Sequence, residues 1–298
     1  MSEEKELTRG EQLRRALVYE RKNGWDRLDA EEGAALEAYC TGYKQFLDAG
    51  KTERECVDRA IAQAEAAGFR AYVRGMELKP GDRIYQVNRD KAIMLAVMGR
   101  KGLEHGVNIG AAHIDSPRLD LKQNPLYESD ELGFFKTHYY GGIRKYQWVT
   151  IPLELHGVVA LKNGEVVRVS VGNGPDDPMF TIDDLLPHLA TDQVKKPLGE
   201  AIPAESLNIL VGSRPLRDDE GSDRVKLSVL ELLNRKYGIV EEDFLSAELC
   251  AVPAFRAVDI GFDRSLIGAY GHDDRVCAYA SLAALLQLGT PERTAVCM

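Results

Sequence analysis

A histidine and an aspartate two residues apart follow an apolar run that is typical of a strand. They lie in the segment Gly110-Ala-Ala-His113-Ile-Asp115-Ser-Pro117. In extended backbone, residues i and i+2 point to the same side, so Asp115 can lie beside His113 and hold its imidazole. A histidine that binds a metal commonly has such a carboxylate partner, which fixes the ring tautomer. The pattern therefore indicates a metal site, and it also fits a packed histidine beside a turn-capping aspartate.

An acidic pair precedes an Ala/Leu-rich segment that is typical of a helix. Asp273 and Asp274 lie in Gly271-His-Asp-Asp-Arg275, and the helix is expected over residues 273–287. Adjacent carboxylates supply oxygen ligands and negative charge for a divalent cation. Asp is also a favoured helix N-cap. Taken alone, this pair fits a cap as well as a metal ligand.

Two other segments carry residue types that suit contact with a substrate or a partner. Residues 140–148 form a glycine turn with aromatics and two cations. Such a turn suits a substrate loop or an interface, where Tyr, Trp and Arg are enriched, and equally an ordinary surface hairpin. His188 stands in the apolar run Leu-Leu-Pro-His188-Leu, within a short helix expected over residues 181–190. Without further context, a histidine in such a helix is usually structural.

The elements that must position these residues change in character along the chain. Over residues 11–68, apolar residues recur at helical spacing, and capping boxes begin at Asp29 and Thr52. The runs 83–87, 91–98 and 107–112 predict strands of an α/β sheet covered on both faces. After Pro117, alternating strands follow, with a hairpin that turns at Asn163-Gly164.

We therefore expect an α/β fold in which one domain is interrupted by an insertion. Residues 1–116 and 251–298 form the α/β domain, and residues 117–250 form the inserted β-rich unit. The last run, residues 291–298, leads into a strand and stops without a turn or cap. We expect the C-terminal half of the α/β domain to be absent from this chain.

The composition narrows the classes of function. The 298 residues include 38 Lys+Arg and 47 Asp+Glu, a net charge of −9 with scattered basic residues, which argues against a nucleic-acid partner. No stretch approaches the roughly 18 apolar residues that cross a bilayer, and the N-terminus lacks the apolar run of a secretion signal. We expect no membrane partner and a cytoplasmic location. The five cysteines form no C-x-x-C pair and are expected to be reduced thiols.

Together, these motifs resemble the aspartyl aminopeptidase family of two-zinc metallopeptidases. His113-Ile-Asp115-Ser-Pro is similar to the family's His-Thr-Asp-Ser-Pro, and His272-Asp-Asp-Arg275 to its Leu-Asp-Asn-Arg. Further landmarks occur in family order: Val87-Asn-Arg, Tyr140-Gly-Gly followed by Trp148, and Leu186-Pro-His188-Leu. The resemblance implies a β-rich dimerisation domain inserted in the α/β domain. It also implies two zinc ions per subunit, with cobalt or manganese as alternatives, and a homodimer that assembles into a tetrahedral dodecamer.

The resemblance also implies roles for single residues. His113 corresponds to a terminal ligand of one metal, Asp115 to its orienting carboxylate and Asp273 to the aspartate that bridges both metals. His188 corresponds to a histidine that reaches the active site of the neighbouring subunit, as an oxyanion donor or as a metal ligand. The general-base glutamate of the family and the remaining metal ligands have no match in this chain. We therefore expect the 298-residue chain alone to be inactive.

The function predicted from the sequence is a metal-dependent aminopeptidase that removes N-terminal residues from peptides with water activated by two metals. An acidic N-terminal residue, Asp or Glu, is the preference that the resemblance implies. Two alternatives remain open. One is a non-catalytic shell or assembly protein with a vestigial metal site, and the other is a related metallohydrolase such as a deacylase.

Overall fold

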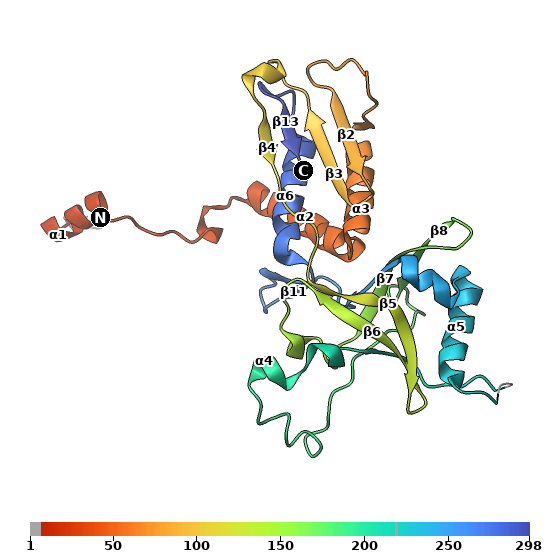
Figure 1. Ribbon diagram of the computed structural model, residues 1–298. Helices are drawn as coiled ribbons and strands as arrows, with labels where there is room; N and C mark the ends of the chain where they lie inside the picture. Colours follow the sequence, from red (N-terminus) through yellow and green to blue (C-terminus); the bar gives the residue numbers. More distant parts are fainter. Residues whose placement is uncertain (1–6, 218–219) are drawn as a thin grey trace. The chain divides into compact units, whose positions relative to one another are not determined.

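The computed structural model describes residues 7–217 and 220–298 of the chain (Figure 1). The chain divides into two compact units, Met1–Gly42 and Tyr43–Met298. The first contains helix α1 (Arg9–Leu17), the 3-10 turn η1 (Trp25–Arg27) and the beginning of α2 (Ala30–Ala49). Asp29 and Glu32 exchange backbone and side-chain hydrogen bonds at the start of α2. The capping box predicted at Asp29 is confirmed, and it fixes where this helix begins.

A five-stranded mixed sheet in the second unit has the order β1-β2-β3-β13-β4. Its strands are β1 (Arg70–Ala71), β2 (Arg83–Asn88), β3 (Ala92–Val97), β4 (Asn108–Gly110) and β13 (Ala295–Cys297), with the 3-10 turn η2 (Leu103–His105) before β4. β13 pairs antiparallel with β3 and parallel with β4. The last strand of the chain therefore lies between two of its early strands.

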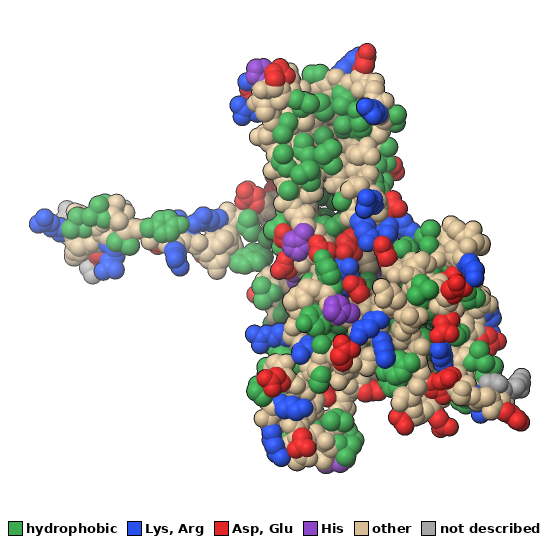
Figure 2. Space-filling model, viewed as in Figure 1, with side chains coloured by type: hydrophobic (Ala, Val, Ile, Leu, Met, Phe, Trp, Pro, Cys, Tyr) green, Lys and Arg blue, Asp and Glu red, His purple; other side chains and the backbone are tan. Residues whose placement is uncertain are grey.

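Helices α3 (Glu53–Ala66) and α6 (His272–Gln287) pack on one face of this sheet (Figure 1). The predicted capping box of Thr52 and Glu55 begins α3. On β3, Leu95 and Val97 are buried whereas Met94 is exposed, and hydrophobic side chains gather over the sheet in Figure 2. The expectation of a sheet covered on both faces is wrong for the described residues, because both helices that they supply lie on the same face.

A six-stranded sheet of antiparallel pairs follows, in the order β8-β7-β10-β5-β6-β9. Its strands are β5 (Arg118–Ser129), β6 (Leu132–Tyr140), β7 (Leu153–Ala160), β8 (Val166–Val171), β9 (Ile209–Gly212) and β10 (Ala247–Pro253). The hairpin predicted to turn at Asn163-Gly164 joins β7 to β8. The boundary predicted at residue 250 falls inside β10. The boundaries of the inserted unit stay a prediction.

The main apolar core belongs to this second sheet. Helix α5 (Arg224–Tyr237) packs on β5, β6 and β9, and the fully buried core residues include Leu119, Leu153, Val159 and Ile209. The remaining short elements are η3 (Lys145–Gln147), α4 (Leu198–Ala201), η4 (Ala204–Ser206), η5 (Glu241–Ser246) and the hairpin β11 (Val258–Ile260) with β12 (Leu266–Gly268). No helix in the described part of the chain has the length and apolarity needed to cross a bilayer.

The helix expected over residues 181–190 is wrong. The backbone there is drawn into bonding with the neighbouring sheet: Leu210 N donates to Thr181 O and Thr150 N donates to Ile182 O. Beyond Ile182 the chain forms an irregular loop with one turn. Pro187 has no N–H to give to a helical hydrogen bond, so the apolar spacing alone does not produce a helix.

A buried charge cluster joins the start of α3 to β7. The His156 side chain has no exposed surface; its Nδ1 lies 2.7 Å from Glu55 Oε1 and its Nε2 lies 3.2 Å from Glu154 Oε2. The buried Lys51 ammonium lies 3.4 Å from the other oxygen of Glu154. Burial by itself would lower the pKa of His156, but the two carboxylates outweigh it and raise the pKa to about 9. His156 is therefore an imidazolium at neutral pH.

This cluster predicts a loss of stability at alkaline pH. Since the folded pKa of His156, about 9, lies above the ordinary value of 6.5, its contribution is complete below pH 6.5 and is lost as the pH rises through 9. The contribution is on the order of 3 kcal/mol. We expect the free energy of unfolding, measured by urea denaturation, to fall between pH 7 and 9.5, and His156→Gln to be less stable at pH 7 with a smaller fall.

The matched control is His105→Gln, because the His105 side chain is mostly exposed. This variant should keep both the stability and the pH profile of the parent chain. An unchanged alkaline slope in His156→Gln would show that other groups cause it.

Candidate metal and peptidase site

His113 stands between two carboxylates on the segment that leads from β4 to β5. Its Nδ1 lies 2.9 Å from the carbonyl oxygen of Asp115 and 3.2 Å from Asp115 Oδ1. Its Nε2 lies 3.1 Å from Asp273 Oδ1, at the start of α6. The side chains of His113 and Asp273 are 52% and 90% exposed. The structure thus brings together, on an open surface, three of the four residues to which the family resemblance gives a role.

The hydrogen-bond pattern around the His113 ring favours a cation between Nε2 and Asp273. Both Asp115 oxygens near Nδ1 are acceptors, which places a proton on Nδ1 and leaves the Nε2 lone pair facing the Asp273 carboxylate. Slight burial would lower the pKa of His113, but the Asp115 carbonyl and carboxylate and the Asp273 carboxylate together raise it. Either a second ring proton or a metal ion relieves the contact between Nε2 and Asp273.

The buried Arg275 guanidinium joins the two halves of the site. It is 1% exposed, and it donates from Nε to the carbonyl of Ile114 at 3.0 Å and from a terminal nitrogen to the carbonyl of Lys51. Ser116 Oγ donates to the Asp273 carbonyl at 2.9 Å. These bonds tie the His113 segment to the first turn of α6, and no spacing rule in the sequence predicted either role.

Gly271 precedes this turn with φ +91, in the left-handed region that favours glycine. A Cβ at this position would also collide with the Arg275 guanidinium. The neighbouring His272 is held by the Tyr43 hydroxyl at 2.9 Å and by the Ile267 carbonyl at 3.1 Å. His272 is therefore a structural residue, and Asp273 is the acid that faces His113.

His188 lies apart from this group. It is on the exposed loop between Ile182 and Ala190, and among the described residues no hydrogen bond or ion pair connects it to His113, Asp115 or Asp273. Leu185, Leu186 and Leu189 of the same loop are exposed. The loop therefore presents the histidine within an apolar surface.

The described residues fit two positions of a metal site. Zinc bound at about 2.0 to 2.1 Å by a histidine and a carboxylate at a tetrahedral angle places the two donor atoms roughly 3.4 Å apart, close to the 3.1 Å between Nε2 and Oδ1. Over residues 7–217 and 220–298, however, no group of three or more His, Cys, Asp or Glu side chains is arranged to hold a metal ion. A catalytic zinc has three protein ligands and a water, so His113 and Asp273 alone would not complete such a site.

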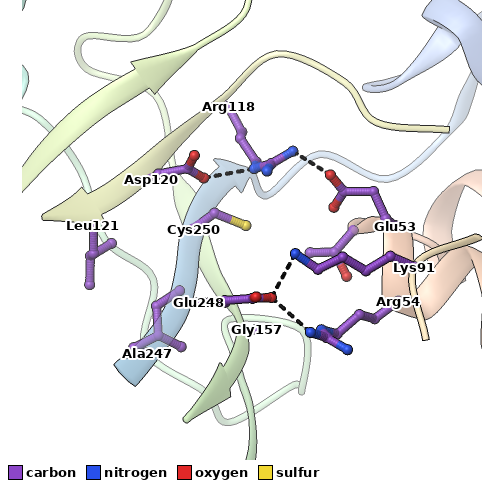
Figure 3. Close-up of a pocket in the computed structure, with 12 residues that line it drawn as sticks. Glu53, Arg54, Lys91, Arg118, Asp120, Leu121, Gly157, Ala247, Glu248 and Cys250 are labelled. Carbon is purple, nitrogen blue, oxygen red and sulfur yellow. Dashed lines mark hydrogen bonds and ion pairs between the residues drawn. The ribbon is translucent and has the colours of Figure 1, made fainter. Parts of the chain in front are cut away.

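A polar hollow lies beside β5 and β10, away from the His113 group, with a cavity volume of about 250 Å³ (Figure 3). Its cations have acidic partners: Arg54 and Lys91 each lie 2.8 Å from Glu248, and Arg118 lies 2.8 Å from Glu53. Burial raises the pKa of the Cys250 thiol in its wall. With its charges paired and its thiol protonated, the hollow joins α3 and the β2–β3 hairpin to the second sheet.

Comparison with known proteins places these features in context. The family model described as "Aminopeptidase I zinc metalloprotease (M18)" matches residues 46–297. A "Probable M18 family aminopeptidase 1" of Clostridium acetobutylicum is 48% identical over 284 residues, which are 94% of this chain and 61% of that protein. The chain thus spans about three fifths of the length of such relatives.

Solved structures show the same similarity. The crystal structure of an M18 family aminopeptidase from Thermotoga maritima is 44% identical, with a TM-score of 0.87 over 94% of this chain and 60% of that one. The mApe1 dodecamer of S. cerevisiae is 17% identical, with a TM-score of 0.65 over 88% of this chain and 60% of that one, a likeness of fold alone.

The two-ligand geometry predicts weak metal binding by the 298-residue chain. In zinc titrations followed by calorimetry, we expect binding that dialysis reverses, and no hydrolysis of Asp- or Glu-p-nitroanilide. His113→Ala should weaken the binding by more than the roughly 10- to 100-fold that loss of a supporting carboxylate costs, whereas His105→Ala should not change it. Two equivalents of zinc retained after dialysis would contradict this prediction.

Proposed function

Because this chain belongs to the aminopeptidase I (M18) family of zinc metalloproteases, we propose that the protein is a metal-dependent aminopeptidase. It removes N-terminal residues, Asp or Glu above all, from peptides. It works in the cytoplasm, a location that the odd number and wide separation of the cysteines in the sequence support. The observation that carries the proposal is the 3.1 Å approach of His113 Nε2 to Asp273 Oδ1, with Asp115 behind the ring.

The residues of this chain hold one side of the reaction site. Asp115 keeps the His113 ring in the tautomer whose Nε2 is free to bind a metal. Asp273 adds a carboxylate that reaches the same point and would help to hold the metal ions. Two zinc ions per subunit, or cobalt or manganese in their place, would supply Lewis-acid polarisation of the peptide carbonyl and an activated water. The general-base glutamate and the remaining ligands have no counterpart among these 298 residues.

We propose further that the protein works as a homodimer that assembles into a tetrahedral dodecamer. The exposed leucines of the His188 loop support this, since apolar patches on a surface mark protein contacts. In that assembly His188 serves the catalytic site of the neighbouring subunit, where it donates a hydrogen bond to the oxyanion of the substrate or, alternatively, binds a metal.

Substitutions at the His113 group should separate metal ligands from their support. In the active enzyme, we expect His113→Ala and Asp273→Asn to abolish hydrolysis of acidic aminoacyl substrates. Asp115→Asn should lower kcat/KM by about 10- to 100-fold with part of the metal retained. Metal content by mass spectrometry and steady-state kinetics measure both effects.

Equal losses of metal in Asp115→Asn and His113→Ala would mean that Asp115 itself binds the metal. N-acetylation of the peptide should block cleavage, because an aminopeptidase requires a free N-terminus. Cleavage of the acetylated peptide would instead identify a deacylase or another amide hydrolase, and absence of both activities with bound metal would favour a shell protein.

Subunit mixing tests the proposed role of His188. As an oxyanion donor, its loss in His188→Ala should lower kcat by about 10²- to 10³-fold with the metal retained, whereas loss of a metal ligand would release zinc. Reassembled mixtures of His188→Ala and His113→Ala subunits should regain activity, because a mixed dimer pairs an intact metal site with the His188 of the other subunit. No recovery, with subunit exchange verified by mass, would place His188 at the site of its own chain.

A further inference from the structure

We propose that Tyr140 is a positioning residue that sets the orientation of the His113 ring through Asp115. The Tyr140 hydroxyl donates to Asp115 Oδ2 at 2.6 Å, while Asp115 Oδ1 faces His113 Nδ1 at 3.2 Å. Each carboxylate oxygen therefore has its own partner. The proposal rests on the proposed function for its effect on activity, but not for its effect on the ring.

The carboxylate needs this second partner because its surroundings are open. The Asp115 side chain is 34% exposed and stands on irregular backbone between β4 and β5. The terminal torsion of an aspartate is broad, so one hydrogen bond leaves the plane of the carboxylate free to swing. A short bond to an ionised carboxylate is about twice as strong as a neutral one. Bonds to both oxygens fix the plane and, with it, the position of the oxygen that accepts the hydrogen bond from His113 Nδ1.

Tyr140 is itself held from two sides. It is the last residue of β6, directly opposite Arg118 on β5, and the Arg118 guanidinium lies 4.2 Å from the centre of its ring. Such a cation over an aromatic face is attractive. Arg118 is held in turn by Asp120 at 2.7 Å and by Glu53 of α3 at 2.8 Å. Figure 3 marks both contacts with dashed lines. The phenol thus reaches Asp115 from a rigid part of the second sheet.

This arrangement gives residues 140–148 a role different from those considered for them. The turn at Gly141 follows Tyr140 and lies against Pro117, and Trp148 is buried in the core of the second sheet. The glycine turn ends β6 at Tyr140, and the Tyr140 side chain contacts the segment after β4. The second sheet therefore acts on the candidate metal ligand through one hydroxyl group.

Tyr140→Phe tests the proposal, because it removes the hydroxyl and keeps the ring under Arg118. The readout is the nitrogen-15 shift of the two ring nitrogens of His113 in the 298-residue chain, measured at a pH above the raised pKa of His113 so that the ring is neutral. We expect the share of the Nδ1–H tautomer to fall. The matched control is Tyr139→Phe. The ring of Tyr139, the residue next to Tyr140, is stacked on His138, so this variant should leave the tautomer of His113 unchanged.

Zinc binding provides a second measurement, and it does not depend on the rate of catalysis. In the active enzyme, Tyr140→Phe should weaken zinc binding by up to about tenfold, less than Asp115→Asn. The double variant should be no worse than Asp115→Asn alone, because Tyr140 acts through Asp115. A parental tautomer in Tyr140→Phe, or additive losses in the double variant, would overturn the proposal. If the tautomer shifts but no peptidase activity is found, the proposed function fails and the positioning role stands.

Discussion

The candidate site depends on one buried cation. Arg275 is enclosed where α6 begins, and its hydrogen bonds to the carbonyls of Ile114 and Lys51 hold three chain segments at fixed separations. A guanidinium suits this position because its planar fork donates in several directions at once. Without these bonds, only the Ser116 hydrogen bond to the Asp273 carbonyl and the exposed contact between Asp273 and His113 would join the two segments directly, and exposed ion pairs contribute little.

Charged groups also connect the two sheets, in a way that apolar packing alone does not. The His156 cluster, the ion pairs around Glu248 and the Arg118 bonds all link α3 or the β2–β3 hairpin to the strands of the second sheet. Charged pairs require particular angles and distances, whereas apolar surfaces tolerate sliding. Hence the second sheet has a defined position relative to α3. This position allows a residue at the end of β6 to reach the segment that carries His113.

Local rules of spacing predicted much of this structure. The capping boxes, the Asn163-Gly164 hairpin and helix α6 follow from residues close in sequence, and so does the contact between His113 and Asp115. Asp273 is 160 residues from His113, so its position beside that histidine was implied by family resemblance and not by spacing. The hydroxyl of Tyr140 and the carbonyl bonds of Arg275 depend on tertiary contacts that no periodicity records. The wrong helix at residues 181–190 has the same origin, because sheet bonding overrode a local apolar pattern.

The face of the five-stranded sheet that no helix among the described residues covers has a consequence for handling the chain. Met94, Ile109 and Met298 expose apolar surface there, and β4 is an edge strand whose outer backbone groups offer a template for another strand. Exclusion of sulfate from protein surfaces strengthens apolar contacts, and cooling weakens them. Concentrated solutions of this chain should accordingly stay clearer in the cold and in chloride buffers than in warm ammonium sulfate.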